Sequence, residues 1–116
     1  MTKEDHYYTG IDLFGEGNLD EAIAEYQKAL ELDANFTDAL HGLAQAYYAK
    51  QDFDNCIATA QRIVALDPED ILGFTSISRA YQRKGMILEA EEAANKARIL
   101  GWKKQLQEQK AKGQNP

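Results

Sequence analysis

The feature that most constrains the fold of this chain is a repeat with a period of 34 residues. Shifting the sequence by this period aligns small residues with small ones and large residues with large ones. Such columns include Gly10/Ala44/Ser78, Leu13/Tyr47/Tyr81, Ala22/Cys56/Ala90, Ala29/Ile63/Ala97 and Leu32/Leu66/Leu100. The pattern predicts three equivalent copies, at residues 3–36, 37–70 and 71–104, followed by a polar tail.

Each copy contains two segments in which apolar residues recur three or four positions apart, as on one face of a helix. One such stripe consists of Ala22, Ile23, Tyr26, Ala29 and Leu30. The spacing predicts an all-α protein with six helices in three antiparallel pairs, together with a short C-terminal helix. The six helices are expected near residues 3–15, 20–32, 37–50, 54–66, 71–84 and 88–100.

Residues at the expected helix starts predict how the second helix of each pair is capped. Asn18 and Glu21 form a candidate N-cap pair in the first copy, and Asp52 is a candidate N-cap in the second. The third copy has Met86 at the equivalent position, so this helix is expected to lack a side-chain cap. Pro68 is expected to separate the second copy from the third.

The small columns predict where the two helices of each pair cross, because helices approach closely only where side chains are small. Cys56 belongs to such a column and is the only cysteine in the chain. We therefore interpret Cys56 as a small buried residue of the core. A reactive thiol would need a basic, partly open neighbourhood, which the adjacent sequence does not provide.

The chain has 116 residues, which fits one domain, and a net charge of −6 that is unevenly distributed. The first copy carries nine acidic and two basic residues, whereas the third carries three acidic and seven basic residues. An acidic chain of this kind is not expected to bind nucleic acid generally, because neutralising phosphates requires a basic face. No segment has the length or composition of a signal peptide or a membrane span, so a soluble, cytoplasmic protein without membrane contact is expected.

These features resemble the tetratricopeptide repeat (TPR) family. In the second copy, the matching residues are Leu40, Leu43, Ala44, Tyr47, Asp52, Phe53, Ile57, Leu66, Asp67 and Pro68. The first copy departs from the family pattern at Ala34, where proline is usual, and the third departs at Gly101-Trp102, which replace Asp-Pro. The resemblance implies a right-handed superhelical solenoid of three helix-turn-helix pairs, forming a single domain over residues 1–116. Trp102 and Leu106 suggest a short capping helix within the tail, residues 102–116.

The resemblance also implies a concave surface formed by the first helix of each pair, where such proteins bind peptides or partner helices. The residues expected to face this groove are Tyr7, Ile11, Phe14, His41, Gln45, Tyr48, Arg79, Gln82 and Arg83. One end of the predicted groove is aromatic and the other is cationic, which suits a partner with an acidic end. Two simpler interpretations stay open: the aromatic residues could belong to the core, and the arginines could form a solvated face.

One functional subclass is not supported by the residues. Some relatives hold the C-terminal carboxylate of chaperones with a clamp of lysine, asparagine and arginine side chains. The corresponding positions in this chain hold Tyr7, Ile11, Gly42, Leu72 and Ser76. None of these residues matches the clamp, so binding of a chaperone tail in that manner is not expected.

The sequence contains no recognisable catalytic, metal-binding or cofactor-binding motif. His6 and His41 lack neighbouring ligands at metal-binding spacing, and no glycine-rich phosphate loop follows a predicted strand. We therefore expect a non-enzymatic adaptor or scaffold that binds a protein or peptide in the groove. The alternative hypothesis is a self-assembling module, in which the acidic N-terminal end of one copy contacts the basic C-terminal end of another.

Overall fold

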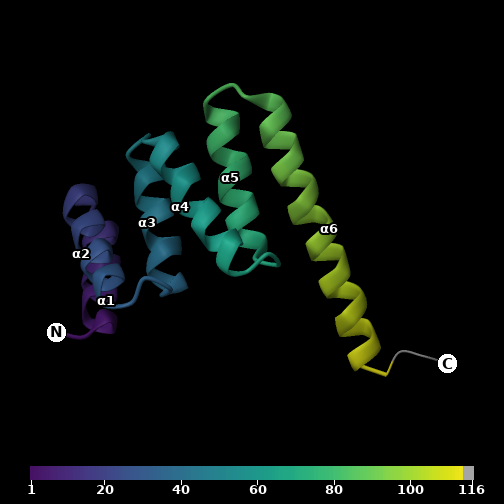
Figure 1. The fold of residues 1–116 in the computed structure, drawn as a ribbon, viewed down its shortest axis with the longest axis horizontal. Helices are drawn as coiled ribbons and strands as arrows, with labels where there is room; N and C mark the ends of the chain where they lie inside the picture. Colours follow the sequence, from purple (N-terminus) through teal and green to yellow (C-terminus); the bar gives the residue numbers. More distant parts are fainter. Residues whose placement is uncertain (114–116) are drawn as a thin grey trace.

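The computed structural model describes residues 1–113, and these residues form six helices without any strand (Figure 1). The helices are α1 (Lys3–Gly15), α2 (Leu19–Leu32), α3 (Thr37–Ala49), α4 (Phe53–Leu66), α5 (Ile71–Arg83) and α6 (Ile87–Ala111). They follow one another along the long axis of the molecule, with α1 and α2 at one end and α6 at the other. The all-α prediction is confirmed, and five of the six helices begin and end within one residue of the expected positions.

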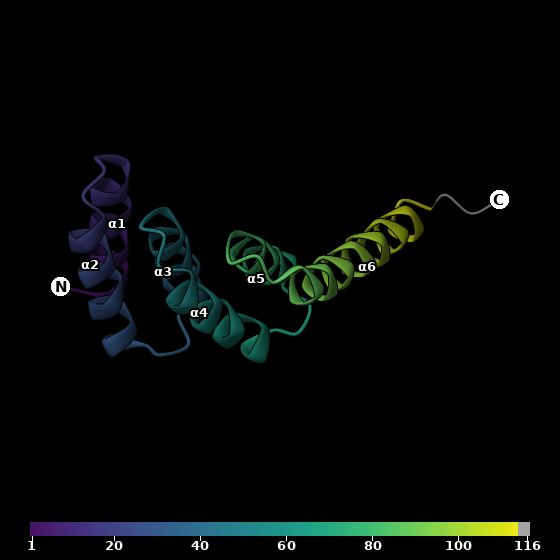
Figure 2. The same cartoon turned by 90° about the horizontal axis from the view of Figure 1, so that it is seen from above.

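The contacts between helices show that the array is curved. Within each pair the two helices pack together, and α2 packs on α3 as α4 packs on α5. The first helices also contact one another across the pairs, α1 with α3 and α3 with α5, whereas in the described part of the chain α2 does not contact α4 and α4 does not contact α6. The first helices therefore lie on the inner, concave side of the array, which is seen from above in Figure 2.

The helix starts confirm two of the three capping predictions. The side chain of Asp52 accepts a hydrogen bond from the backbone N–H of Asn55 at 3.3 Å, and Met86, the N-cap residue of α6, provides no side-chain cap. The predicted cap at Asn18 is wrong, because this side chain makes no capping hydrogen bond. Its amide nitrogen instead donates to the carboxylate of Glu16 at 3.3 Å.

The turn inside each pair has the same backbone geometry in all three copies. Gly17, Gln51 and Gly85 occupy equivalent positions, and all three have a positive φ, at 85°, 67° and 79° respectively. Glycine adopts this left-handed region without steric cost, whereas a residue with a Cβ atom does not. The second copy therefore keeps the turn although it has lost the glycine.

Tyr26 is the largest side chain of the first core cluster and is 2% exposed. A Cβ atom at Gly10 would lie 2.7 Å from the Tyr26 ring, and one at Gly42 would lie 2.6 Å from it. Glycine on both α1 and α3 thus leaves the space that the ring fills. The equivalents of Tyr26 are Ala60 and Ala94, which are smaller, so the first pair is packed differently from the other two.

Cys56 is 1% exposed and packs with Ala44, Ile57 and Ala80, which agrees with its interpretation as a small core residue. Burial raises the pKa of its thiol to about 11. At pH 8 this lowers the thiolate fraction roughly a hundredfold relative to an exposed cysteine. The folded protein should therefore react with a thiol reagent far more slowly than the urea-unfolded chain. Equal labelling rates in the two states would contradict the buried position.

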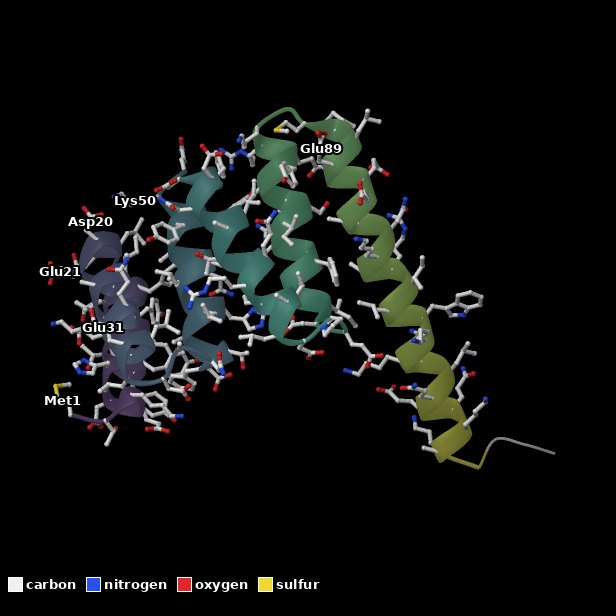
Figure 3. The ribbon with its side chains drawn as sticks, viewed as in Figure 1. Met1, Asp20, Glu21, Glu31, Lys50 and Glu89 are labelled. Atoms are coloured by element: carbon white, nitrogen blue, oxygen red, sulfur yellow. The ribbon has the colours of Figure 1, made fainter. Side chains whose placement is uncertain are left out.

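Consecutive pairs are joined by an ion pair that repeats with the sequence period. Lys50 at the end of α3 pairs with Asp20 in the first turn of α2, with 2.6 Å between the charged atoms (Figure 3). Lys84 at the end of α5 pairs in the same way with Asp54 in the first turn of α4. Both pairs link residues that are 30 positions apart, so each joint between copies carries one lysine–aspartate contact on the same edge of the array.

The expected separate capping helix is not present, because α6 continues without interruption for 25 residues (Figure 1). No proline occurs between Pro68 and Pro116, and Gly101 alone does not break the helix. Trp102 and Leu106, which were expected to cover the last pair, are exposed. Residues 114–116 of the predicted tail lie outside the described residues, and the expectation of one domain over residues 1–116 stays a prediction.

Replacing Gly101 with alanine should stabilise the protein by about 1 kcal/mol, since glycine in a helix interior is less favourable than alanine by this amount. A Cβ atom at Gly101 would meet no atom within 4 Å. The matched control is Gly85→Ala, which places a Cβ at a φ of 79° and should destabilise the protein. Urea unfolding measures both changes, and a destabilising Gly101→Ala would show that α6 does not continue through this residue.

Candidate binding groove on the first helices

A cavity of about 290 Å³ opens on the concave side of the array. It is lined by Phe14, Ala44, Gln45, Tyr48, Ala49, Cys56, Ser76 and Arg79. These residues come from α1, α3, α4 and α5, so all three copies contribute to it. Four of them, namely Phe14, Gln45, Tyr48 and Arg79, are among the nine residues that the sequence predicts for the groove.

Two arginines of α5 lie against aromatic rings at one side of this cavity. The guanidinium carbon of Arg79 is 4.7 Å from the centre of the Tyr48 ring. The guanidinium carbon of Arg83 is 5.7 Å from the same ring and 5.0 Å from the ring of Phe53. Tyr48 and Phe53 contact each other edge to face, with 5.5 Å between their centres. We call these four residues the arginine–aromatic cluster.

The charges of the cluster are not neutralised by neighbouring acids. Within residues 1–113 no carboxylate lies within ion-pair distance of Arg79 or Arg83, whereas their neighbour Lys84 is paired with Asp54. The Arg83 guanidinium, and to a lesser extent that of Arg79, lowers the pKa of the Tyr48 phenol. The cluster therefore presents two cations held on an aromatic support.

The other aromatic residue predicted for the groove packs at the joint between the first two copies. Tyr7 is half-buried, and its ring centre lies 5.4 Å from that of Phe36 and 6.1 Å from that of Tyr26. Ile11 is exposed on α1, and Gln82 is exposed on α5 next to the cluster. The structure does not bring Tyr7, Ile11 or Gln82 to the cavity wall.

His41 occupies the position equivalent to Tyr7, and it likewise contacts the residue that caps the first helix of the next pair. Its Nε2 atom lies 2.9 Å from the carboxylate of Asp70. The other oxygen of Asp70 accepts a hydrogen bond from the backbone N–H of Gly73 at 2.8 Å and so caps α5. His41 thus contacts a capping residue and does not line the cavity. That His41 contacts a bound peptide stays a prediction.

Sequence reasoning missed several residues that shape this site. Phe53 supports Arg83 although it lies on α4, and Ala44, Ala49, Cys56 and Ser76 provide the small walls of the cavity. A signal for two of these existed, since Ala44 and Cys56 belong to the small columns of the repeat. Small residues at a helix crossing leave room at the surface as well as in the core.

Two further properties of the described residues bear on function. They contain no group of three or more histidine, cysteine, aspartate or glutamate side chains arranged to hold a metal ion. Among the helices that they form, none combines the length and the apolar character needed to span a membrane.

Comparison with solved structures identifies several similar folds. A crystal structure of MamA superposes with a TM-score of 0.86 at 28% identity, covering 89% of this chain and 60% of the MamA chain. The type III secretion translocator chaperone SycD of Yersinia enterocolitica has a TM-score of 0.81 at 20% identity, covering 84% of this chain and 74% of that chain. The second TPR of Spaghetti (RPAP3), bound to an HSP90 peptide, has a TM-score of 0.81 at 20% identity, covering 86% of this chain and 93% of that chain.

The sequence comparison agrees with the fold. Residues 13–75, more than half of the chain, match the tetratricopeptide repeat family. The matched segment runs from the end of α1 to the start of α5 and includes Asp20 and Lys50, which pair at the joint between the first two copies. The chain belongs to the tetratricopeptide repeat family, whose fold generally serves protein–protein interaction.

Proposed function

We propose that this protein is a non-enzymatic adaptor that binds a peptide segment of a partner in the groove of α1, α3 and α5. The segment would place an apolar side chain in the cavity and an acidic group on the arginine–aromatic cluster. The observation that carries the proposal is the position of Arg79 and Arg83 over Tyr48, beside a cavity and without a carboxylate partner among the described residues.

The geometry favours recognition of an acid by these arginines. Stacking on a ring holds a guanidinium plane in place while its N–H groups stay available at the edges. A carboxylate can accept two parallel hydrogen bonds from such a group. Because Arg79 and Arg83 are four residues apart on α5, both project from the same face of the helix, and together they suit an acidic motif.

The cavity limits what accompanies the acid. A volume of about 290 Å³ is at the lower end of the range for small-molecule sites, so it suits one or two side chains rather than a large cofactor. Phe14, Tyr48 and the alanines of its wall are apolar, and Gln45 offers an amide at its edge. The preferred ligand is therefore a short segment with an apolar residue near an acidic one.

The structures of Spaghetti bound to the HSP90 peptide SRMEEVD show that a similar fold can hold an acidic peptide. This chain lacks clamp residues at the corresponding positions, so a free C-terminal carboxylate should not be required. We expect peptides with a free acid and with an amidated C-terminus to bind this protein equally well, provided that the acidic side chain is kept.

A library of random seven-residue peptides displayed on phage tests the proposal directly. Selection on the purified protein should enrich sequences with an aspartate or glutamate close to a large apolar residue. Fluorescence anisotropy with a labelled enriched peptide then gives the dissociation constant at low and high salt. Enrichment without any acidic residue, or no enrichment at all, would contradict the proposal.

The alternative of head-to-tail assembly stays a prediction. The first and third copies lack the residues that would form the lysine–aspartate contact with a neighbouring molecule. At the position of Lys50 and Lys84 the first copy has Glu16, and at the position of Asp20 and Asp54 the third copy has Leu88. A neighbouring molecule stacked in the same register would therefore lack the lysine–aspartate pair. Cytoplasmic localisation also stays a prediction.

A further inference from the structure

We propose that α6 is a dimerisation helix, which pairs in antiparallel orientation with α6 of a second copy of this chain. The proposal concerns the C-terminal end of the array, where α6 lies, and is independent of the groove. Its basis is an exposed stripe on α6, together with the distribution of charge along the same helix.

The stripe follows a heptad spacing and is largely apolar. Its members alternate steps of four and three residues: Leu88, Glu92, Asn95, Ile99, Trp102 and Leu106. The four apolar side chains among them are 83%, 56%, 65% and 44% exposed, in chain order. Residues at this spacing form one seam on a helix and are typical of helix pairs. Exposed apolar patches of this kind mark interaction sites.

The stripe is free for a partner because α6 contacts the rest of the molecule through its opposite face. Ala90 and Ala93 are buried, and the hydroxyl of Ser78 on α5 donates to the backbone carbonyl of Ala90 at 2.8 Å. Ala90 and Ala97 lie about half a turn from the stripe. Since α6 is the last helix of the array, none of the described helices lies on its outer side (Figures 1 and 2).

An antiparallel pair keeps the two polar residues of the stripe, Glu92 and Asn95, away from their own equivalents in the second copy. When two α6 helices run in opposite directions about a two-fold axis at position 97, Leu88 faces Leu106 of the second copy. Glu92 then faces Trp102, and Asn95 faces Ile99. The Leu88–Leu106 contacts join two apolar side chains, and the polar residues Glu92 and Asn95 face an apolar residue instead of their own equivalents. The indole N–H of Trp102 can donate to the Glu92 carboxylate, which gives that polar residue a partner.

The charges of α6 favour the same orientation. Before the axis at position 97 it carries Glu89, Glu91, Glu92 and Lys96, and after it Arg98, Lys103, Lys104, Lys110 and a single acid, Glu108. An antiparallel pair places the acidic half against the basic half, whereas a parallel pair would place like charges together. At the centre, Lys96 meets its own equivalent, but it is paired with Glu92 of its own chain at 3.8 Å.

This contact closes at two copies, because both molecules use the same surface. It thus differs from head-to-tail assembly, which would add further copies. In analytical ultracentrifugation, we expect a monomer–dimer equilibrium that shifts with concentration. Trp102 is the only tryptophan, so its emission should move to shorter wavelength as the dimer forms. A monomer at every concentration, or growth beyond the dimer, would overturn the proposal.

Two variants separate the stripe from unspecific hydrophobic association. Ile99→Glu/Leu106→Glu keeps Trp102 and should weaken dimerisation at least a hundredfold. The matched control, Leu32→Glu, changes an exposed leucine of α2 and should leave the dimer unchanged. Circular dichroism checks that both variants stay helical. Equal weakening by the two variants would overturn the assignment to α6.

A charge exchange and a cross-link test the orientation. Glu89→Lys and Lys103→Glu should each weaken the dimer about tenfold, and the double variant should restore it. A short bismaleimide should link two Lys96→Cys molecules, since these positions meet near the axis, while buried Cys56 stays protected. It should not link Leu88→Cys molecules, which would lie about 27 Å apart along the helix. Linking of Leu88→Cys would indicate a parallel pair and overturn the proposal.

Discussion

Replacing Tyr26 with alanine is expected to lower the free energy of unfolding by about 3–5 kcal/mol, the largest effect of any single change proposed for this chain. The side chain is 2% exposed and fills the space between α1 and α3 that Gly10 and Gly42 leave open. Its removal leaves a void that these two glycines cannot fill. Urea unfolding followed by circular dichroism would measure the loss, with Gln27→Ala on the exposed face of the same helix as the control.

A second substitution makes this prediction specific to the ring–glycine contact. Gly42→Ala alone should cost about 1–3 kcal/mol, because its Cβ atom would lie 2.6 Å from the Tyr26 ring. In the Tyr26→Ala background the same substitution should cost little or even stabilise, since the ring is gone. The two changes should thus be strongly non-additive. Simple additivity would show that Tyr26 and Gly42 do not share this space.

The double substitution Arg79→Ala/Arg83→Ala should weaken binding of an acidic peptide by roughly two to four powers of ten. A hydrogen bond to a charged group contributes about 1.5–3 kcal/mol, and about 1.4 kcal/mol corresponds to a factor of ten. The helical circular-dichroism signal should stay unchanged, because both guanidinium groups lie at the surface over Tyr48 and Phe53. Anisotropy titrations with an acidic peptide selected on the wild-type protein measure the loss.

The matched control is Arg62→Ala, which also removes an exposed arginine but lies on α4, where its guanidinium reaches the carbonyl of Ala34 at 3.4 Å. Its affinity for the same peptide should remain within a factor of two or three of the wild type, since the remaining charge effect is screened. If both variants weaken binding equally, net charge rather than the arginine–aromatic cluster is responsible, and the groove proposal fails.

Much of the fold could be predicted because its strongest determinant is periodic. The 34-residue columns locate three helix pairs, and the period of apolar residues within them locates the helix ends. The end of α6 could not be predicted in the same way, because the repeat pattern stops at Gly101 while local helix propensity continues. The cap predicted at Asn18 is absent for a different reason: its side chain bonds to Glu16, in the turn before the helix, and not to a backbone N–H of α2.

The candidate site was predictable only in part. Helical spacing places Tyr48, Arg79 and Arg83 on first helices, and the structure brings them together on the concave side. Which residue at a given position faces the cavity depends on the joints between copies. Tyr7 and His41 occupy equivalent positions, yet one contacts Phe36 and the other contacts Asp70. Phe36 and Asp70 are the N-cap residues of α3 and α5. The helical period of a single segment carries no information about contacts with them.

The repeated lysine–aspartate joint also has a consequence for lengthening the protein by design. A duplicate of the second copy, inserted between the second and third copies, would carry both the lysine and the aspartate of the joint. The Lys50–Asp20 and Lys84–Asp54 contacts would then be joined by one more contact of the same kind. A copy appended after the third would meet Leu88 and would first require Leu88→Asp. The chain can therefore be expanded from within by duplication, whereas growth at its C-terminal edge requires a new joint.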